Sequence, residues 1–207
     1  MLKIGVLISG GGTNLQALID NIEEGNIDGE ISLIVSNRED AYGLERGRLA
    51  GIETMYLDPK KYDTPEEYDL KLIEEFKNRE IDLIVLAGYL RILTKTFIGE
   101  FKGKIINIHP SLIPSFCGDG YYGDRVHRAV LEYGCKITGA TVHFVDEGTD
   151  TGPIILQEVI KVEEDDDVDS LKQKVLNIEH EILSKAVKLF CEGRIVLEGR
   201  NAKINMR

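Results

Sequence analysis

An amide and an imidazole stand two residues apart at the end of an apolar run, in the stretch IINIHPSLIP that begins at Ile105. Alternate side chains of a β-strand point to the same face, so Asn107 and His109 would lie side by side. An amide N–H beside an imidazole suits stabilisation of an oxygen that becomes negatively charged during a reaction. The alternative is a capping asparagine and a surface histidine before a proline turn, and these residues alone leave both open.

Three glycines followed by Thr13 and Asn14 separate an apolar run from an amphipathic one near the N-terminus. Glycine allows positive φ angles and a close approach of the backbone to a ligand. A helix that begins there presents unpaired N–H groups and a partial positive charge, which together suit a phosphate. The stretch is not a P-loop, because no Gly-Lys-Ser/Thr follows, and it lacks the full dinucleotide spacing. We therefore predict a phosphate site, with a plain tight turn as the alternative.

Two further segments carry carboxylates that suit proton transfer or ligand binding. An acidic loop with Asp146, Glu147 and Asp150 follows the apolar stretch VHFV, and one of these groups would orient His109 or accept a proton. The alternative for this loop is an ordinary turn. Glu179 lies beside the apolar stripe of a predicted helix, where its carboxylate would either meet a ligand hydroxyl or extend into water.

Strand and helix patterns alternate through the first half of the chain, and these elements must position the polar residues. Near-continuous apolar runs of this kind are typical of parallel strands that are covered on both faces. A helical pattern at residues 64–80 has Thr64 as a candidate N-cap and Pro65 in its first turn. Strands that alternate with helices predict right-handed βαβ units and a doubly wound sheet. The predicted strands cover residues 3–9, 31–37, 52–57, 81–88 and 104–109.

The second half changes pattern. Strand-like runs at 136–145 and 152–162 follow each other without a helix between them, which predicts an antiparallel part of the sheet. A long amphipathic helix follows at about 169–191, preceded by an acidic turn, and residues 193–199 form a short strand. The predicted fold is a single α/β domain over residues 1–207, with a doubly wound, mostly parallel sheet whose C-terminal half is partly antiparallel. Its halves would meet near residue 100, at about 1–100 and about 101–207.

Composition narrows the classes of function. The 207 residues are 43% hydrophobic, which is enough for a substantial core, and the net charge of −11 argues against nucleic-acid binding. The three cysteines are widely spaced, so we expect neither a disulfide framework nor a metal site, and we expect a reducing, cytoplasmic setting. No apolar stretch reaches the roughly 20 residues that span a bilayer. We expect small-molecule substrates, no membrane contact, and a monomer or homodimer.

Four segments in this order resemble a known family: GVLISGGGTNLQALID, LAGYLRIL, INIHPSLIP and VHFVDEGTDTGPIILQ. They are similar to the folate-dependent formyltransferases, and the SGGGTN and IEHEIL segments resemble the phosphoribosylglycinamide formyltransferase branch, also called glycinamide ribonucleotide transformylases. The resemblance runs from Lys3 to about Gly199. It implies transfer of a formyl group from 10-formyltetrahydrofolate, as co-substrate, to the amine of glycinamide ribonucleotide in purine biosynthesis, without a metal.

The resemblance also implies roles for particular residues. Asn107, His109 and Asp150 match the family's catalytic trio, and the first half matches its phosphate-binding half. The other matches are Gly12, Thr13 and Asn14 for the substrate phosphate, Glu179 for the ribose hydroxyls, and Leu90, Arg91, Ile92, Leu93, Asn107, Asp146, Glu147, Gly148 and Thr149 for the folate.

The chain departs from the family pattern at three places, one of which is the loop from Asp146 to Asp150, where details differ although the final aspartate is kept. An insertion at Phe116–Asp124 follows the catalytic strand, where it would line or cover the substrate. Pro65 stands where several relatives carry an arginine that meets the folate tail.

Other functions remain as alternatives. Another formyl-folate enzyme, such as a methionyl-tRNA formyltransferase or a formyltetrahydrofolate hydrolase, would carry an additional domain beyond this catalytic unit. A nicotinamide-dependent oxidoreductase would use the glycine loop for a pyrophosphate and needs an acidic residue at the end of the second strand, where this chain has Asn37. A non-catalytic nucleotide-binding module would tolerate loss of Asn107, His109 or Asp150, and all three are present.

Overall fold

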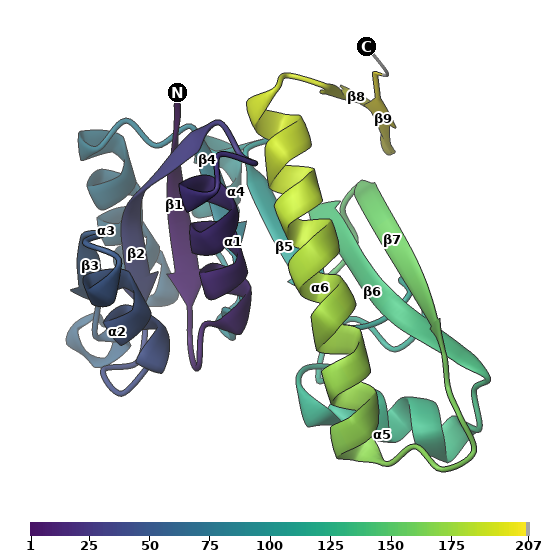
Figure 1. The fold of residues 1–207 in the computed structure, drawn as a ribbon. Coiled ribbons are helices and arrows are strands. Elements are labelled where there is room, and N and C mark those ends of the chain that lie inside the picture. Colours follow the sequence, from purple (N-terminus) through teal and green to yellow (C-terminus); the bar gives the residue numbers. More distant parts are fainter. Residues whose placement is uncertain (206–207) are drawn as a thin grey trace. The chain divides into compact units, whose positions relative to one another are not determined.

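The computed structural model describes residues 1–205, and these fall into two units, residues 1–107 and the chain from Ile108 onward. The first unit contains a parallel sheet whose strands lie in the order β3-β2-β1-β4-β5 (Figure 1). The central strands are buried on both faces, which explains their continuous apolar sequences. The strands are β1 Leu2–Ile8, β2 Gly29–Ser36, β3 Thr54–Tyr56, β4 Leu83–Leu86 and β5 Ile105–His109.

Helices cover both faces of this sheet. Helices α1 (Thr13–Glu23) and α2 (Tyr42–Leu49) contact each other, as do α3 (Pro65–Asn78) and α4 (Lys95–Glu100) (Figure 1). The short 3-10 helix η1 covers Pro59–Lys61. The predicted start of α3 is confirmed, because the Thr64 side chain accepts a hydrogen bond from the Glu67 N–H and Pro65 is the first helical residue.

The second unit is built on an antiparallel pair, β6 (Ile137–Phe144) and β7 (Ile154–Lys161). The long helix α6 (Val168–Cys191) packs along both strands, and α5 (Asp124–Tyr133) packs against α6 (Figure 1). The acidic turn before α6 provides its cap, since Asp167 and Ser170 form a capping box. A hairpin of β8 (Ile195–Glu198) and β9 (Asn201–Ile204) follows, and β9 contacts β7.

The predicted α/β fold, mostly parallel and partly antiparallel in its C-terminal half, is confirmed. The prediction missed α4, α5 and β9. Helix α4 spans only Lys95–Glu100, too short for a repeating apolar stripe, and α5 begins inside the inserted segment that looked like a loop. Among residues 1–205, no helix combines the length and the apolar character that crossing a membrane requires.

Candidate active site

The glycine loop ends at Gly12, which occupies the N-cap position of α1 with a φ of 71°. This left-handed conformation favours glycine, and a Cβ at Gly12 would lie 2.7 Å from the Cα of Gly43. Within residues 1–205, no side chain caps the start of α1, and Gly10 and Gly11 are exposed. The first-turn N–H groups and the helix dipole are therefore suited to an anion, and the phosphate site stays a prediction.

Arg46 of α2 adds a positive charge beside this loop. Its Nε donates to the Gly11 carbonyl oxygen over 2.8 Å, and its Nη1 donates to the Gln16 side chain over 3.1 Å. The guanidinium also lies over the Tyr42 ring, 5.0 Å from the centroid. These contacts hold a cation against the loop, which strengthens its attraction for a phosphate.

The segment after β4 lies next to the glycine loop. The Ser9 N–H donates to the Gly88 carbonyl oxygen over 3.1 Å, and the Ser9 hydroxyl accepts from the Leu90 N–H over 2.9 Å. Within the segment, Ile92 is 71% exposed and Leu90 is exposed as well, whereas Leu93 is buried. Arg91 lies over the Tyr68 ring, 4.5 Å from its centroid. Apolar side chains held out on a fixed backbone suit a flat aromatic ligand.

Asn107 and His109 lie on β5 as predicted. Asn107 is half-buried and His109, the last residue of the strand, is 4% exposed. His109 Nε2 lies 2.9 Å from the Phe116 carbonyl oxygen, which can only accept, so Nε2 carries the hydrogen. His109 Nδ1 lies 3.5 Å from Asp150 Oδ2, which brings together the two groups predicted to act as a pair.

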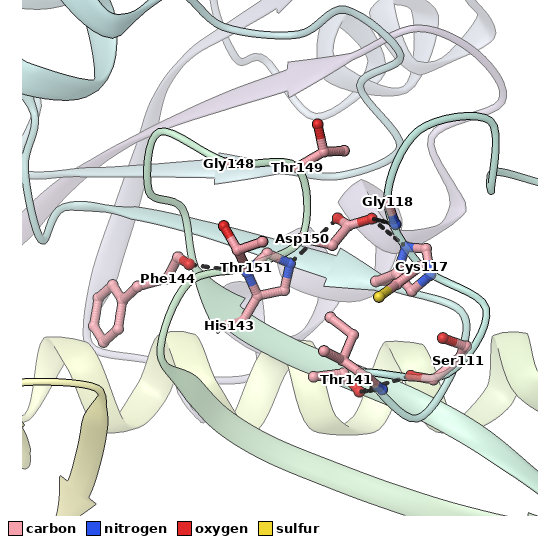
Figure 2. A network of polar contacts seen from close by, with 12 residues as sticks. Ser111, Cys117, Gly118, Thr141, His143, Phe144, Gly148, Thr149, Asp150 and Thr151 are labelled. Atoms are coloured by element: carbon pink, nitrogen blue, oxygen red, sulfur yellow. Dashed lines mark hydrogen bonds and ion pairs between the residues drawn. The ribbon is translucent and has the colours of Figure 1, made fainter.

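The chain that leaves β5 is held by β6 and β7. The Thr141 hydroxyl donates to the Ser111 carbonyl oxygen over 2.6 Å and accepts from the Ile113 N–H over 3.1 Å (Figure 2). Gln157 of β7 donates to both the Ile113 carbonyl oxygen and the Thr141 hydroxyl. The exit from the catalytic strand is therefore fixed by side-chain hydrogen bonds as well as by its prolines.

Asp150 has an uncommon backbone conformation and contacts several polar groups. Its φ of 57° lies in the left-handed region, which is uncommon outside glycine but tolerated by Asp and Asn. Its Oδ2 accepts from the Gly118 N–H over 2.9 Å, and its Oδ1 lies 3.6 Å from His143 Nε2 (Figure 2). Gly152 allows the loop to approach β6, because a Cβ there would lie 1.8 Å from the Phe144 carbonyl oxygen.

The surroundings of His109 and Asp150 lower the pKa values of both side chains. Burial lowers the pKa of His109 below its usual value, although the charge of Asp150 opposes this. Burial opposes ionisation of Asp150, but its contact with His143, the charge of His109 and the Gly118 N–H outweigh burial and lower the pKa of the Asp150 carboxyl. At neutral pH the site therefore holds an ionised carboxylate beside an imidazole whose burial favours its neutral form.

The inserted segment contacts the catalytic pair directly. Phe116 supplies the carbonyl oxygen for His109, and Gly118 supplies the N–H for Asp150. Asp119 accepts a hydrogen bond from the Thr149 hydroxyl over 2.9 Å, which joins the insertion to the acidic loop. The Phe116 ring packs edge-on against Tyr121 and Tyr133. The insertion therefore contacts both His109 and Asp150, and its place beside the substrate stays a prediction.

The remaining predicted site residues differ in their exposure and in their hydrogen bonds. Glu179 on α6 is 8% exposed, so the alternative with its carboxylate extended into water is wrong. Asp146 accepts hydrogen bonds from the Gly148 N–H and the Thr151 hydroxyl, which shape the acidic loop, while Glu147 is exposed. Thr13 is half-buried and Asn14 is buried in the first turn of α1. Asn107 belongs to the first unit, whereas Glu179 belongs to the second.

The Cys117 thiol lies near Asp150 in surroundings that disfavour the reactive thiolate. Burial, aided by the charge of Asp150, raises the pKa of the Cys117 thiol, which donates to the Pro114 carbonyl oxygen over 3.4 Å. None of the three cysteines, which all lie within residues 1–205, forms a disulfide. Across residues 1–205 there is no group of three or more His, Cys, Asp or Glu side chains arranged to hold a metal ion.

Sequence reasoning missed three contributors to the site. Arg46 comes from the short helix α2, in which no motif or spacing singles it out. Gly118 acts through its N–H, which no residue type reveals. His143 carried a signal, because it lies two residues after Thr141 on a strand that is buried from Thr138 to Phe144.

Comparison with known proteins identifies close similarity over nearly the whole chain. Residues 2–187 match the family model described as formyl transferase. The phosphoribosylglycinamide formyltransferase of Escherichia coli (strain K12) is 42% identical over 194 residues, which cover 94% of this chain and 89% of that protein. The trifunctional purine biosynthetic protein adenosine-3 of Homo sapiens is 42% identical over 98% of this chain, which spans only 19% of that protein's length.

Solved structures give the same result. The crystal structure of glycinamide ribonucleotide transformylase 1 from Symbiobacterium toebii superimposes with a TM-score of 0.94 at 46% identity. The match covers 99% of this chain and 94% of that one. Fold and sequence are therefore similar to the same group of proteins.

Proposed function

The chain belongs to the formyl transferase family, and from this premise we propose that it transfers the formyl group of 10-formyltetrahydrofolate to the amine of glycinamide ribonucleotide. The products are formylglycinamide ribonucleotide and tetrahydrofolate, in de novo purine biosynthesis. The observation that carries the proposal is the buried pair of His109 and Asp150 at the end of β5, with their separation of 3.5 Å. The names of the Escherichia coli and Symbiobacterium toebii relatives support the substrate.

The reaction requires a stabilised oxygen. The amine nitrogen attacks the formyl carbon, and the C=O bond becomes a C–O⁻ single bond in a tetrahedral intermediate. The Asn107 amide donates to this oxygen, as does His109 once it carries a second proton. His109 Nε2–H is held by the Phe116 carbonyl oxygen in the structure, so this bond must be shared with or yield to the substrate oxygen.

The reaction also moves one proton. The attacking nitrogen becomes positively charged and loses a proton to Asp150, directly or through a water molecule. The leaving nitrogen of the folate gains this proton from Asp150, directly or through the water molecule, the carbon–nitrogen bond to it breaks, and the C=O bond forms again. Protons balance over the cycle, so the chemistry requires an ionised Asp150 at the start, which agrees with the lowered pKa of its carboxyl.

Substrate binding is proposed from the remaining residues. The phosphate lies at Gly12, Thr13 and Asn14 beside Arg46, and Glu179 binds the ribose hydroxyls. Cysteines that form no disulfide within residues 1–205 are compatible with a reducing cytoplasmic location. The net charge of −11 is compatible with small-molecule partners rather than nucleic acid. The folate contacts Asn107, the exposed apolar segment Leu90, Arg91, Ile92 and Leu93, and the loop residues Asp146, Glu147, Gly148 and Thr149.

A spectrophotometric assay of formyl transfer tests the proposal. Purified protein is mixed with 10-formyltetrahydrofolate or its dideaza analogue, with and without glycinamide ribonucleotide. We expect turnover that depends on the amine and that falls about 10²–10³-fold in His109→Ala. Ile106→Val, a buried change on the same strand, serves as the control and should cost only about 0.5–1.5 kcal/mol of stability with little loss of rate.

Two results would contradict the proposal. Folate consumption without the amine would indicate a hydrolase. Substrate binding without turnover in the wild-type protein would indicate a binding module.

A further inference from the structure

A buried serine follows the central strand of the first unit. Strand β1 lies between β2 and β4 in the sheet, so the residue after β1 is flanked by the ends of both neighbouring strands (Figure 1). Ser9 is this residue, and it is 2% exposed. A buried hydroxyl needs hydrogen-bond partners, since leaving it unsatisfied costs free energy. The partners of Ser9 therefore indicate its role.

The Ser9 hydroxyl binds the chain on both sides of β1. It donates to Asn37 Oδ1 over 2.6 Å, directly after β2, and it accepts from the Leu90 N–H over 2.9 Å, in the segment after β4. These partners lie 28 and 81 residues away along the chain. The Leu90 N–H can only donate, so the single hydrogen of the hydroxyl is directed at Asn37. One oxygen atom thus joins three segments of the first unit.

A second buried serine in the same sheet shows that burial alone does not require such distant partners. Ser36 is the last residue of β2 and is fully buried. Its hydroxyl donates to the Arg38 carbonyl oxygen over 2.9 Å and accepts from the Arg38 N–H over 3.0 Å. Ser36 therefore satisfies its hydroxyl within its own turn, as serine commonly does. Ser9 differs because its hydroxyl holds segments that are distant in sequence.

The contacts of Ser9 join the two segments that are proposed to bind the two substrates. Ser9 leads directly into the glycine loop, residues 10–12, which is proposed for the phosphate. Its N–H donates to the Gly88 carbonyl oxygen over 3.1 Å, and its hydroxyl holds Leu90, the first residue of the segment proposed for the folate. On the other side of the loop, the Gly43 N–H of α2 donates to the Gly10 carbonyl oxygen over 3.0 Å. The position of the folate segment relative to the glycine loop therefore depends on Ser9.

We propose that Ser9 is a positioning residue that sets the distance between the phosphate-binding loop and the folate-binding segment, and so places the amine against the formyl carbon. This deepens the proposed function and rests on it. Each substrate binds through its own contacts, so neither affinity depends strongly on Ser9. The rate does depend on it, because two bound reactants react only in the correct geometry, and a displacement of about 1 Å can cost about 10²-fold.

Hydrogen exchange of the ligand-free protein, followed by NMR, tests the contact without an activity assay. Ser9→Ala removes the acceptor of the Leu90 N–H, so we expect the Leu90 amide to exchange about tenfold faster or more. Ser36→Ala is the matched control, since it removes an equally buried serine hydroxyl from the neighbouring strand, and it should leave this exchange rate unchanged. Equal exchange at Leu90 in the two variants would overturn the proposal, whether or not the protein transfers formyl groups.

Steady-state kinetics test the positioning role. We expect Ser9→Ala to lower kcat about 10-fold to 100-fold, while the KM values of glycinamide ribonucleotide and 10-formyltetrahydrofolate change only a few-fold. Ser9→Thr keeps the hydroxyl and should recover most of the rate. Ser36→Ala should lower thermal stability and leave kcat unchanged. An unchanged kcat in Ser9→Ala, or a loss confined to the KM values, would show that Ser9 does not position the reactants.

Asn37→Ala disturbs the same contact from its half-buried side and keeps the proposal testable if Ser9→Ala fails to fold. The Ser9 hydroxyl loses its acceptor and can rotate away from Leu90. We expect kcat to fall by a smaller factor than in Ser9→Ala, again with little change in the KM values. The double variant Ser9→Ala/Asn37→Ala should lose no more than Ser9→Ala alone. An unchanged kcat in Asn37→Ala, or fully additive losses in the double variant, would contradict the proposal.

Discussion

The glycine loop of the first unit, proposed to bind phosphate, and the cluster around Asp150 in the second unit, proposed to be catalytic, are built from different groups. The loop at Gly12 uses backbone N–H groups at the start of α1, and its geometry depends on glycine. The cluster at Asp150 uses side chains from β5, β6 and the acidic loop together with two backbone groups of the insertion, and its properties depend on burial and on neighbouring charges. A backbone site tolerates side-chain changes but not a Cβ at a critical position, whereas a side-chain site responds to single atoms and to pH.

The largest expected effect comes from Asp150→Asn. Asparagine tolerates the left-handed φ of 57° at this position and keeps the shape of the side chain, but it cannot accept a proton. We expect kcat to fall about 10²–10⁴-fold with little change in thermal stability. Steady-state kinetics and thermal unfolding of the same preparation measure both. A loss of less than tenfold would show that the cluster does not depend on this carboxylate.

The next-largest expected effect is a loss of stability at acidic pH that is caused by His127 in the second unit. Burial lowers the pKa of His127 on α5 to about 4, with Asp124 opposing and Lys172 and His109 reinforcing the shift. The unfolded chain, with a histidine pKa near 6.5, then binds more protons between about pH 4 and pH 6.5. Stability is therefore complete above about pH 7 and falls as the pH drops through this window. By pH 4.5 His127 should account for a loss of about 2–3 kcal/mol.

Urea unfolding at pH 7 and pH 4.5 measures this loss, and His127→Gln serves as the comparison. The variant should lose less stability between the two pH values than the wild-type protein, whatever its stability at pH 7. His109, whose pKa is also lowered by burial, contributes in the same direction and remains in both proteins. Equal losses in the two proteins would show that His127 protonates as readily in the fold as in the unfolded chain.

A backbone change tests the phosphate loop. Gly12→Ala places a Cβ 2.7 Å from the Gly43 Cα at a φ of 71°, so we expect a loss of about 1–3 kcal/mol of stability and weaker binding of the phosphate substrate. Gly10→Ala is the matched control for stability, because no described atom lies within 4 Å of its added Cβ. Denaturant unfolding compares the two variants. Equal stabilities would mean that the close approach of the loop to α2 is not required.

The smallest expected effect concerns the contact between the insertion and the acidic loop. Thr149→Val and Asp119→Ala each remove the hydrogen bond of 2.9 Å between these side chains. Each should lower kcat/KM only a few-fold, since an exposed hydrogen bond contributes about 0.5–1.5 kcal/mol. The double variant should lose no more than either single variant if they act through one bond, and fully additive losses would contradict this coupling.

The sequence alone determined much of the first unit. Apolar runs gave the strands, because parallel strands are buried on both faces, and Thr64 with Pro65 gave the start of α3. The glycine loop and the pair on β5 were also predictable, since the chemistry of each is local to a few consecutive residues. The antiparallel pair β6 and β7 followed from two strand patterns without a helix between them.

Only the tertiary structure decided the composition of the catalytic cluster. Asp150, His143 and Gly118 come from a loop, a strand and an insertion, and no sequence spacing links them to His109. Burial, which sets the direction of the pKa shifts of His109 and His127, is a property of the packed fold. Residue types along the chain determine which chemistry is available, whereas packing determines which groups meet, which tautomers they adopt and where their protons reside.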